Sequence, residues 1–422
     1  MDRWRRAAAS AGSWRRGGSA QGGGRAGRPD ALPAEDGDGP AGDRTVTDGA
    51  APGPQPPHSA MEQPIVFFGP GPSKIPDQVL ERVQAELLNY AGTGVSVMEI
   101  SHRSAEFQQI ISGTETRLRR LLHIPDNYRV LFVQGGATGQ FAAVPLNLCV
   151  NGKADYFITG TWSKKAAAEA ARYLDMQPVL PATEKFLGIA GRDQWRLRPD
   201  ADYVYYCDNE TVEGVEFQEV PDTGDVPLVA DMSSNILTRP IDVSKFGVIF
   251  AGAQKNMGPA GLTIVIVRED LLGRGLPVCP SVLSYSTMAK AGSLYNTPPC
   301  FNVYVTGKVL DWVEEQGGVE EMSKRSDTKA KLIYTAADQS DGFYVAPVDG
   351  AARSRTTVQL RISAGAELEK KFLKEAEEVG FKSLKGHRSV GGLRVALFNA
   401  LTVPQIEKLV KFLGQFATQN RG

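Results

Sequence analysis

The chain has 422 residues, of which 42% are hydrophobic, so it is long enough to fill the cores of two domains. Its 47 lysines and arginines nearly balance 48 aspartates and glutamates, and this balance argues against nucleic acid or a membrane surface as the main partner. Four widely spaced cysteines and four histidines predict neither a disulfide framework nor a metal site. No apolar run has the length of a membrane span.

The first sixty residues differ in composition from the rest. Residues 1–60 are rich in Gly, Ala, Pro, Arg and Asp and nearly lack aliphatic side chains, so they are predicted to be a disordered extension. Their Arg-rich, acid-poor start partly matches a mitochondrial transit peptide, although its glycines oppose an amphipathic helix. We expect a cytoplasmic protein, with mitochondrial targeting as one alternative and Met61 as an alternative start.

A glycine-rich loop follows the first apolar run of the folded part. Residues 130–148, VLFVQGGATGQFAAVPLNL, are typical of a strand, a loop and a helix. The loop over residues 135–139 presents backbone N–H groups at a helix start, an arrangement that suits a phosphate group. No GK[ST] sequence follows, so the loop is not a P-loop, and a purely structural turn is the other interpretation.

Two further apolar runs end next to residues that can contact a ligand. Trp162 lies where a strand gives way to a helix, and its ring either fills the core or stacks on a flat cofactor. The run over residues 203–207 leads into the sequence NET, which contains Thr211.

The next two strands end in residues of opposite charge. Asp231 ends the apolar run VPLVAD, and a buried carboxylate needs a cationic or donor partner. Lys255 follows the apolar run over residues 248–251, where desolvation lowers the pKa of its amine and lets it react with a carbonyl group. This pair is the arrangement that pyridoxal phosphate (PLP) requires. A direct ion pair without a ligand and a solvated loop lysine are the alternatives.

The alternation of strands and helices predicts an α/β fold whose strands bring these residues together. Ligand sites in such folds lie at the carboxyl ends of the strands, so we expect one crevice lined by Gly136, Trp162, Thr211, Asp231 and Lys255. A helix over residues 303–315 and the following glycine pair predict a large domain, residues 61–315, and a small C-terminal domain, residues 316–422.

The motifs TGTWS, NET, DMSSN, FGVIFAGAQKNMGPAG and GHRSVGGLR occur in an order that resembles the phosphoserine aminotransferase family, and the resemblance extends from about Met61 to the C-terminus. It implies the fold type I of PLP-dependent transferases, with a mixed, mostly parallel sheet in the large domain and a smaller C-terminal α/β domain. It also implies a homodimer with shared active sites. The implied reaction is a ping-pong transfer from L-glutamate to 3-phosphohydroxypyruvate that gives O-phospho-L-serine and 2-oxoglutarate in L-serine biosynthesis.

The resemblance implies roles for individual residues. Lys255 and Asp231 would be catalytic, with Lys255 bound covalently to the cofactor and Asp231 bound to its pyridine nitrogen. The cofactor-binding residues would be Gly136, Ala137, Thr138, Trp162, Thr211, Asp231, Gln254, Lys255, Asn296 and Thr297, of which the last two would reach the cofactor phosphate of the partner subunit. The substrate-binding residues would be His102, Arg103, His387, Arg388 and Arg394, of which the first two would come from the neighbouring subunit. Arginine and imidazolium groups suit carboxylate and phosphate oxygens.

Two other functions compete with this one. The first is a cysteine desulfurase or another class V PLP enzyme, but a desulfurase needs a reactive cysteine on a mobile loop late in the chain, and none follows Cys300. A non-catalytic binding or scaffold protein of the same fold would have no use for both Lys255 and Asp231.

Overall fold

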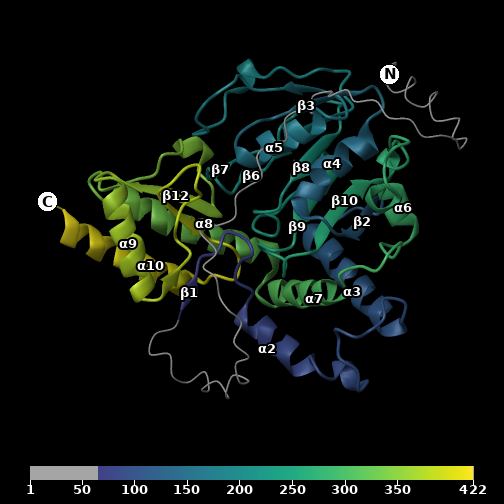
Figure 1. Ribbon diagram of the computed structural model, residues 1–422, viewed down its shortest axis with the longest axis horizontal. Helices are drawn as coiled ribbons and strands as arrows, with labels where there is room; N and C mark the ends of the chain where they lie inside the picture. Colours follow the sequence, from purple (N-terminus) through teal and green to yellow (C-terminus); the bar gives the residue numbers. More distant parts are fainter. Residues whose placement is uncertain (1–64, 422) are drawn as a thin grey trace, which may run out of the picture. The chain divides into compact units, whose positions relative to one another are not determined.

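A computed structural model describes residues 65–421 of the chain (Figure 1). The predicted disorder of residues 1–60, the partial match to a transit peptide and the alternative start at Met61 lie outside this range. The α-helices of the described residues are α2 (Asp77–Glu86), α3 (Ala105–Leu122), α4 (Gly136–Leu148), α5 (Thr161–Ala170), α6 (Tyr285–Lys290), α7 (Cys300–Glu315), α8 (Gly318–Asp338), α9 (Ala366–Glu378) and α10 (Val403–Asn420).

A seven-stranded sheet with the order β2-β10-β9-β8-β5-β3-β4 carries the larger part of this fold. Its strands are β2 (Tyr128–Val133), β3 (Lys153–Tyr156), β4 (Asp175–Pro178), β5 (Tyr203–Cys207), β8 (Leu228–Asp231), β9 (Val248–Gly252) and β10 (Thr263–Arg268). β10 runs antiparallel to β2 and β9, and the other neighbouring pairs are parallel. The prediction of a mixed, mostly parallel sheet is confirmed.

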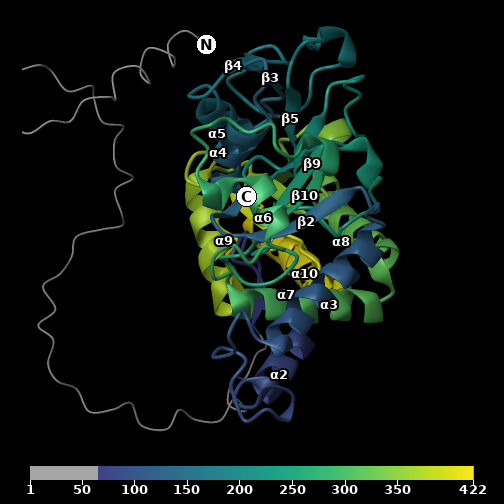
Figure 2. The same ribbon diagram turned by 90° about the vertical axis from the view of Figure 1, so that its right-hand side faces the viewer.

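Helices cover both faces of the central sheet. Along β9, Ile249 and Ala251 pack in one core with side chains of α3 and α7, whereas Val248 and Phe250 pack in another with side chains of α4 and α5. Figure 2 shows these two pairs of helices on opposite sides of β9 and β10. A strand that is buried on both faces must be apolar at nearly every position, which is why the sequence identifies β9.

The C-terminal residues form smaller sheets and a core of their own. β11 (Tyr344–Val345), β12 (Thr357–Ile362) and β14 (Leu393–Ala396) form an antiparallel sheet, and β1 (Val66–Phe67) pairs in parallel with β13 (Phe381–Lys382). A separate two-stranded sheet, β6 (Asn209–Glu210) with β7 (Val215–Glu216), lies in the middle of the chain. The N-terminal side chains Val66 and Phe68 pack in this C-terminal core, together with α8, α9 and α10. Residues 65–421 belong to one compact unit, so the predicted boundary after residue 315 stays a prediction.

Helix α10 shows how the sequence pattern produces this packing. Ile406, Leu409, Leu413 and Phe416 recur every three or four residues and are buried on one face of the helix.

Among residues 65–421, no helix combines the length and the apolar composition that a membrane crossing requires.

Candidate active site

A cavity of about 370 Å³ lies at the carboxyl ends of the parallel strands. Its lining residues are Pro70, Gly71, Gly136, Ala137, Thr138, Trp162, Cys207, Asn209, Thr211, Val212, Asp231, Ser233, Ser234, Gln254, Lys255, His387 and Arg394. All five residues that the sequence analysis expected in one crevice line this cavity. Asp231 ends β8, and the other four residues follow β2, β3, β5 and β9. They meet because strands that run in the same direction present their carboxyl ends at one edge of the sheet.

The amine of Lys255 points at a hydroxyl group in the cavity. Lys255 Nζ donates a hydrogen bond of 2.6 Å to Thr211 Oγ1 and lies 6.0 Å from the centroid of the Trp162 ring. Burial lowers the pKa of Lys255, while the nearby carboxylate of Asp231 opposes that change. The amine is therefore closer to its neutral, nucleophilic form than a solvated lysine is.

The N-terminal segment closes one side of Lys255. A Cβ atom at Gly71, whose φ is +130°, would lie 3.3 Å from Lys255 Cε and Cγ. Ser73 N donates to Gln254 O over 2.9 Å, and Ser73 Oγ donates to the backbone carbonyl of Lys255. Residues 71–73 therefore approach the Lys255 side chain at a distance that leaves little room for a larger residue at position 71.

Asp231 is buried at the end of β8, with 4% of its surface exposed. Its Oδ1 accepts a hydrogen bond of 2.9 Å from Ser233 N, and Ser233 Oγ accepts one of 3.1 Å from Gly252 N. Burial raises the pKa of Asp231, whereas the bond from Ser233 and the charge of Lys255 oppose the change. Among the described residues, no ion pair joins Lys255 to Asp231: Lys255 donates to Thr211, and Asp231 accepts from Ser233.

The glycine-rich loop opens helix α4 as predicted. Gly135 and Gly136 have φ values of +101° and +64°, and the first turn of α4 lines the cavity through Gly136, Ala137 and Thr138. A Cβ at Gly135 would lie 3.3 Å from Gly139 Cα, so the turn is tight. Backbone N–H groups and the positive end of a helix dipole at this place suit an anion.

Two buried glutamates that the sequence analysis missed hold the start of helix α5. Glu210 accepts from Trp162 N over 2.9 Å and from Ser163 N over 2.8 Å. Glu213 Oε1 accepts from Thr161 N over 3.1 Å and from Thr161 Oγ1 over 2.5 Å. Burial, together with the charge of Glu213, raises the pKa of Glu210 to about 8. Hydrogen bonds to the two carboxyls therefore fix the backbone that carries Trp162. Because its pKa is raised, the Glu210 carboxyl retains its proton at neutral pH.

This arrangement explains the glycine in TGTWS. A Cβ at Gly160 would lie 2.5 Å from Glu210 Cδ and 2.6 Å from Glu213 Oε2, so no side chain fits there unless the carboxyls move. The sequence gives no local signal for this contact, because residues 209–214 and α5 are far apart along the chain.

The predicted substrate residues divide between the cavity and its surroundings. His387 and Arg394 line the cavity, and His387 Nδ1 lies 2.7 Å from Ser389 Oγ. Burial lowers the pKa of Arg394, whereas the charge of Glu213 opposes the change. Arg388 is exposed and does not line the cavity.

Four further predicted residues lie outside this chain's own cavity lining. His102 and Arg103 precede α3, where Arg103 Nε donates to His102 Nε2 over 3.4 Å. Asn296 and Thr297 contact Gln134 instead: Gln134 Nε2 donates to Thr297 O over 2.9 Å, and Asn296 Nδ2 donates to Gln134 Oε1 over 3.3 Å. Gln134 immediately precedes the glycine-rich loop.

Cys207, Asn209 and Ser234 also line the cavity, although the sequence analysis gave them no role. Asn209 Nδ2 donates to Ser234 Oγ over 2.7 Å, and Ser234 Oγ donates to Asn209 O over 2.8 Å. Burial raises the pKa of Cys207, so its thiol stays protonated. The position of Cys207 at the end of a buried strand is the signal that could have identified it.

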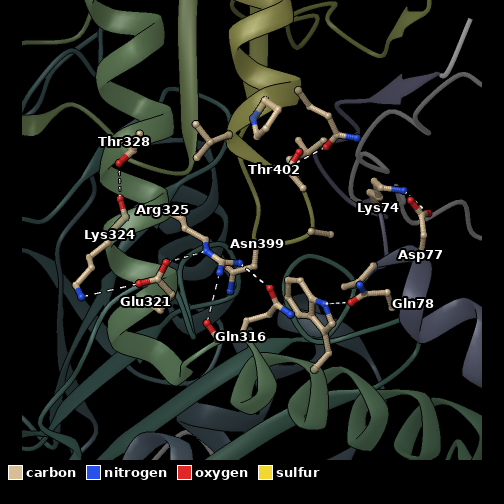
Figure 3. Close-up of a pocket in the computed structure, with 17 residues that line it drawn as sticks. Lys74, Asp77, Gln78, Gln316, Glu321, Lys324, Arg325, Thr328, Asn399 and Thr402 are labelled. Atoms are coloured by element: carbon tan, nitrogen blue, oxygen red, sulfur yellow. Dashed lines mark hydrogen bonds and ion pairs between the residues drawn. The ribbon is translucent and has the colours of Figure 1, made fainter.

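A second cavity, of about 540 Å³, holds none of the predicted residues (Figure 3). Its charged groups already pair with each other or with neutral side chains. Lys74 lies 2.5 Å from Asp77, and Arg325 lies 3.1 Å from Glu321 and donates to Gln316 over 2.9 Å. The cavity at the strand ends is therefore the better candidate for the active site.

Comparisons with known proteins support the same site. The family described as Aminotransferase class-V matches residues 65–409. The chain is 52% identical over 362 residues to phosphoserine aminotransferases of Drosophila melanogaster and of Pseudomonas aeruginosa, and the match covers 85% of this chain and 100% of each relative.

Solved structures agree with the sequence matches. The phosphoserine aminotransferase of Bacillus circulans subsp. alkalophilus superimposes with a TM-score of 0.82 at 45% identity, covering 84% of this chain and 98% of the other. The PLP-bound phosphoserine aminotransferase of Trichomonas vaginalis gives a TM-score of 0.80 at 39% identity, with 82% and 99% covered. The chain therefore belongs to the phosphoserine aminotransferases within the class-V aminotransferase family.

Proposed function

We propose that the chain transfers the amino group of L-glutamate to 3-phosphohydroxypyruvate and so produces O-phospho-L-serine and 2-oxoglutarate for L-serine biosynthesis. The observation that carries the proposal is the juxtaposition of Lys255, Asp231 and the start of α4 in one cavity that also contains His387 and Arg394. The 52% identity to phosphoserine aminotransferases supports this choice of substrates.

The residues of the cavity fit PLP, the cofactor of a transaminase of this family. The Trp162 ring lies 6.0 Å from the Lys255 amine, and Trp162 Nε1 is buried without a hydrogen-bond partner among the described residues. The first turn of α4 and Gln254 would hold the phosphate, and Thr211 would bind the ring hydroxyl. When bound, PLP supplies an electron sink that stabilises negative charge at the substrate α-carbon.

The protein groups divide the remaining work. Lys255 would bind the cofactor covalently and would move a proton at the substrate α-carbon through Nζ, for which its lowered pKa is suited. Asp231 would hold the pyridine nitrogen protonated, because its buried carboxylate gains a cationic partner. The Glu210 and Glu213 carboxyls keep the Trp162 backbone in place.

The substrate needs binding groups for two anionic ends. Arg394 would bind the carboxylate that both substrates share, since it lines the cavity. His387, which lines the cavity, would bind the phosphate. Arg388, exposed beside it, and the residues His102 and Arg103 of a neighbouring subunit would add positive charge there. A neutral cleft could not hold both groups at once.

We also propose a homodimer with shared sites, a division into residues 61–315 and 316–422, and a cytoplasmic location. Support for the homodimer comes from His102, Arg103, Asn296 and Thr297, which do not line the cavity of their own chain. Mixing inactive Lys255→Ala with inactive Thr297→Ala protein tests it. Shared sites predict recovered activity of up to about a quarter of the wild-type rate, and no recovery contradicts them.

A comparison of three acceptors tests the proposed reaction. With L-glutamate as donor, the kcat/KM for 3-phosphohydroxypyruvate should exceed that for pyruvate or glyoxylate by at least about a hundredfold, because only the first acceptor engages the phosphate-binding groups. Equal values for the three acceptors would contradict the proposed substrate.

A further inference from the structure

Lys329, on helix α8, is buried with 1% of its surface exposed. Its side chain donates to three backbone carbonyls, at 2.9 Å to Leu397 O, 2.9 Å to Phe398 O and 3.0 Å to Leu401 O. These acceptors match the three N–H donors of an ammonium group, whereas a neutral amine has only two. Residues 397–401, which connect β14 to α10, are therefore tied to α8 through one side chain.

The same connection contacts the loop that carries Lys255. Asn399 N donates to Asn256 Oδ1 over 3.1 Å, and Asn399 Nδ2 donates to Leu237 O over 2.9 Å. Asn256, the residue directly after Lys255, donates in turn to Ser234 O over 3.2 Å. Asn399 and Asn256 are 7% and 5% exposed, so water does not replace these bonds.

Arg394 lies on β14, three residues before this connection begins at Leu397. Leu397 N donates to Thr356 O over 2.8 Å, which continues the pairing of β14 with β12 beyond the end of the strand. Arg394 N donates to Leu384 O over 2.8 Å. Residues 397–401 continue directly from β14, and Asn399 contacts Asn256, so the connection links the strand that carries Arg394 to the residue that follows Lys255.

Holding a loop with a buried lysine requires the desolvation of a charged group. Removing an ammonium group from water is strongly unfavourable, and only a set of well-aligned acceptors offsets that cost. Burial and the charge of Arg325, which lies on the same helix, lower the pKa of Lys329 to about 7. An apolar side chain would fill the same volume without this cost, so the polar contacts point to a requirement for exact placement of the loop.

We propose that Lys329 is a positioning residue that keeps Arg394 aligned with Lys255, acting through Asn399 and Asn256. The inference rests on the proposed function, in which Arg394 binds the substrate carboxylate. It predicts that loosening the connection weakens substrate binding while the cofactor remains attached and correctly held.

The test replaces Lys329 by methionine, which has a similar length and no donor. In K329M holoenzyme, the KM for L-glutamate and for 3-phosphohydroxypyruvate should each rise at least about tenfold, because Arg394 loses part of its charge-assisted contact. The kcat should change less than about threefold, and the visible absorption of the resting holoenzyme should be unchanged. Calorimetric titration with glutarate, an unreactive dicarboxylate, should show a matching rise in Kd.

A second variant loosens residues 397–401 at a contact that does not involve Lys329. N399A leaves Lys329 and the backbone bond to Asn256 intact and cuts the bond from the Asn399 side chain to Leu237 O, which holds the same connection, so it should raise KM in the same direction. In the double variant K329M/N399A the effects should not add, because both changes act on one path. If K329M fails to fold, the KM values and the glutarate Kd of N399A decide the question alone.

Two control variants separate positioning from stability. K331M removes an exposed lysine from the same helix and should behave as wild type. I333V trims a buried side chain of the same core and should lower the thermal midpoint without raising KM. Unchanged KM and glutarate Kd in K329M and N399A, with only a lower midpoint as in I333V, would overturn the positioning role. Absent wild-type turnover would overturn the proposed function and with it this inference.

Discussion

The amine of Lys255 donates to the hydroxyl of Thr211 over 2.6 Å, while the carboxylate of Asp231, one strand away, accepts from its own loop instead. Lys255 and Asp231 therefore form no ion pair with each other. An ion pair would bind the amine and the carboxylate to each other, whereas in the observed arrangement both groups line the cavity and can contact a ligand there. This arrangement is what a cofactor with a reactive carbonyl and a basic ring nitrogen requires.

Replacing Lys255 by alanine should abolish turnover. No other amine lines the cavity among the described residues, so covalent attachment of PLP should be lost as well. Borohydride reduction followed by mass spectrometry of the tryptic peptides detects the attachment. A cofactor that is still bound covalently to K255A would show that another lysine does this work.

Replacing Asp231 by asparagine should leave a folded protein that binds PLP but transaminates at least about a hundredfold more slowly. A neutral amide cannot hold the pyridine nitrogen protonated, so the electron sink is weakened. Steady-state rates at saturating cofactor measure the effect. Rates within a factor of about two of wild type would remove Asp231 from the catalytic machinery.

The raised pKa values of Glu210 and Glu213, at the start of α5, predict that the stability of the protein depends on pH. The pKa of Glu210 in the folded protein is raised to about 8, so the folded state keeps a proton that the unfolded chain releases above its ordinary pKa of 4.5. Glu210 alone should therefore lower stability by at most about 1.4 kcal/mol per pH unit as pH rises from about 4.5 to about 8, and Glu213, whose pKa burial also raises, acts in the same direction. The thermal midpoint measured across this window should fall with rising pH.

The variant Glu210→Gln cannot titrate and should flatten this dependence, although it lowers the midpoint at acid pH because one N–H of α5 loses its acceptor. Glu407→Gln, at an exposed position on α10, serves as the matched control and should retain the wild-type slope. Identical slopes in wild type and E210Q would show that Glu210 is not the group that holds the proton.

Much of this site could be predicted from the sequence because its residues follow apolar strands. Asp231 and Lys255 end or follow runs that are buried on both faces of a sheet, and the parallel topology brings those ends together. Glu210 and Glu213 could not be assigned, because their bonds to α5 join segments that are about fifty residues apart. The same reason hides the path from Lys329 to Lys255, in which every contact is long-range.

Replacing Arg388 and replacing Arg394 should affect the two acceptors differently. Arg388→Ala should reduce kcat/KM for 3-phosphohydroxypyruvate by about ten- to a hundredfold, because a charge-assisted hydrogen bond to the phosphate is worth roughly 1.5 to 3 kcal/mol. The kcat/KM for pyruvate, which lacks the phosphate, should fall much less. Arg394→Ala should impair both acceptors, since both carry the carboxylate. Equal losses for the two acceptors in R388A, or no loss in either, would contradict a phosphate contact by Arg388.

Removal of residues 1–60 should leave activity and the thermal midpoint within error of the full chain, because their composition cannot contribute a core. Activity assays and calorimetry on both proteins measure this. A large fall in the midpoint would show that the segment contributes to stability. A fluorescent reporter fused to residues 1–60 tests localisation separately, and its import into mitochondria would contradict the expected cytoplasmic location.

Transfer of a labelled amino group tests the central claim most directly. Purified protein with PLP is incubated with ¹⁵N-labelled L-glutamate and 3-phosphohydroxypyruvate, and the products are identified by mass spectrometry. The proposed function predicts ¹⁵N in O-phospho-L-serine and an equal amount of 2-oxoglutarate, with neither product formed by K255A. Unlabelled or absent O-phospho-L-serine, in the presence of bound cofactor, would contradict it.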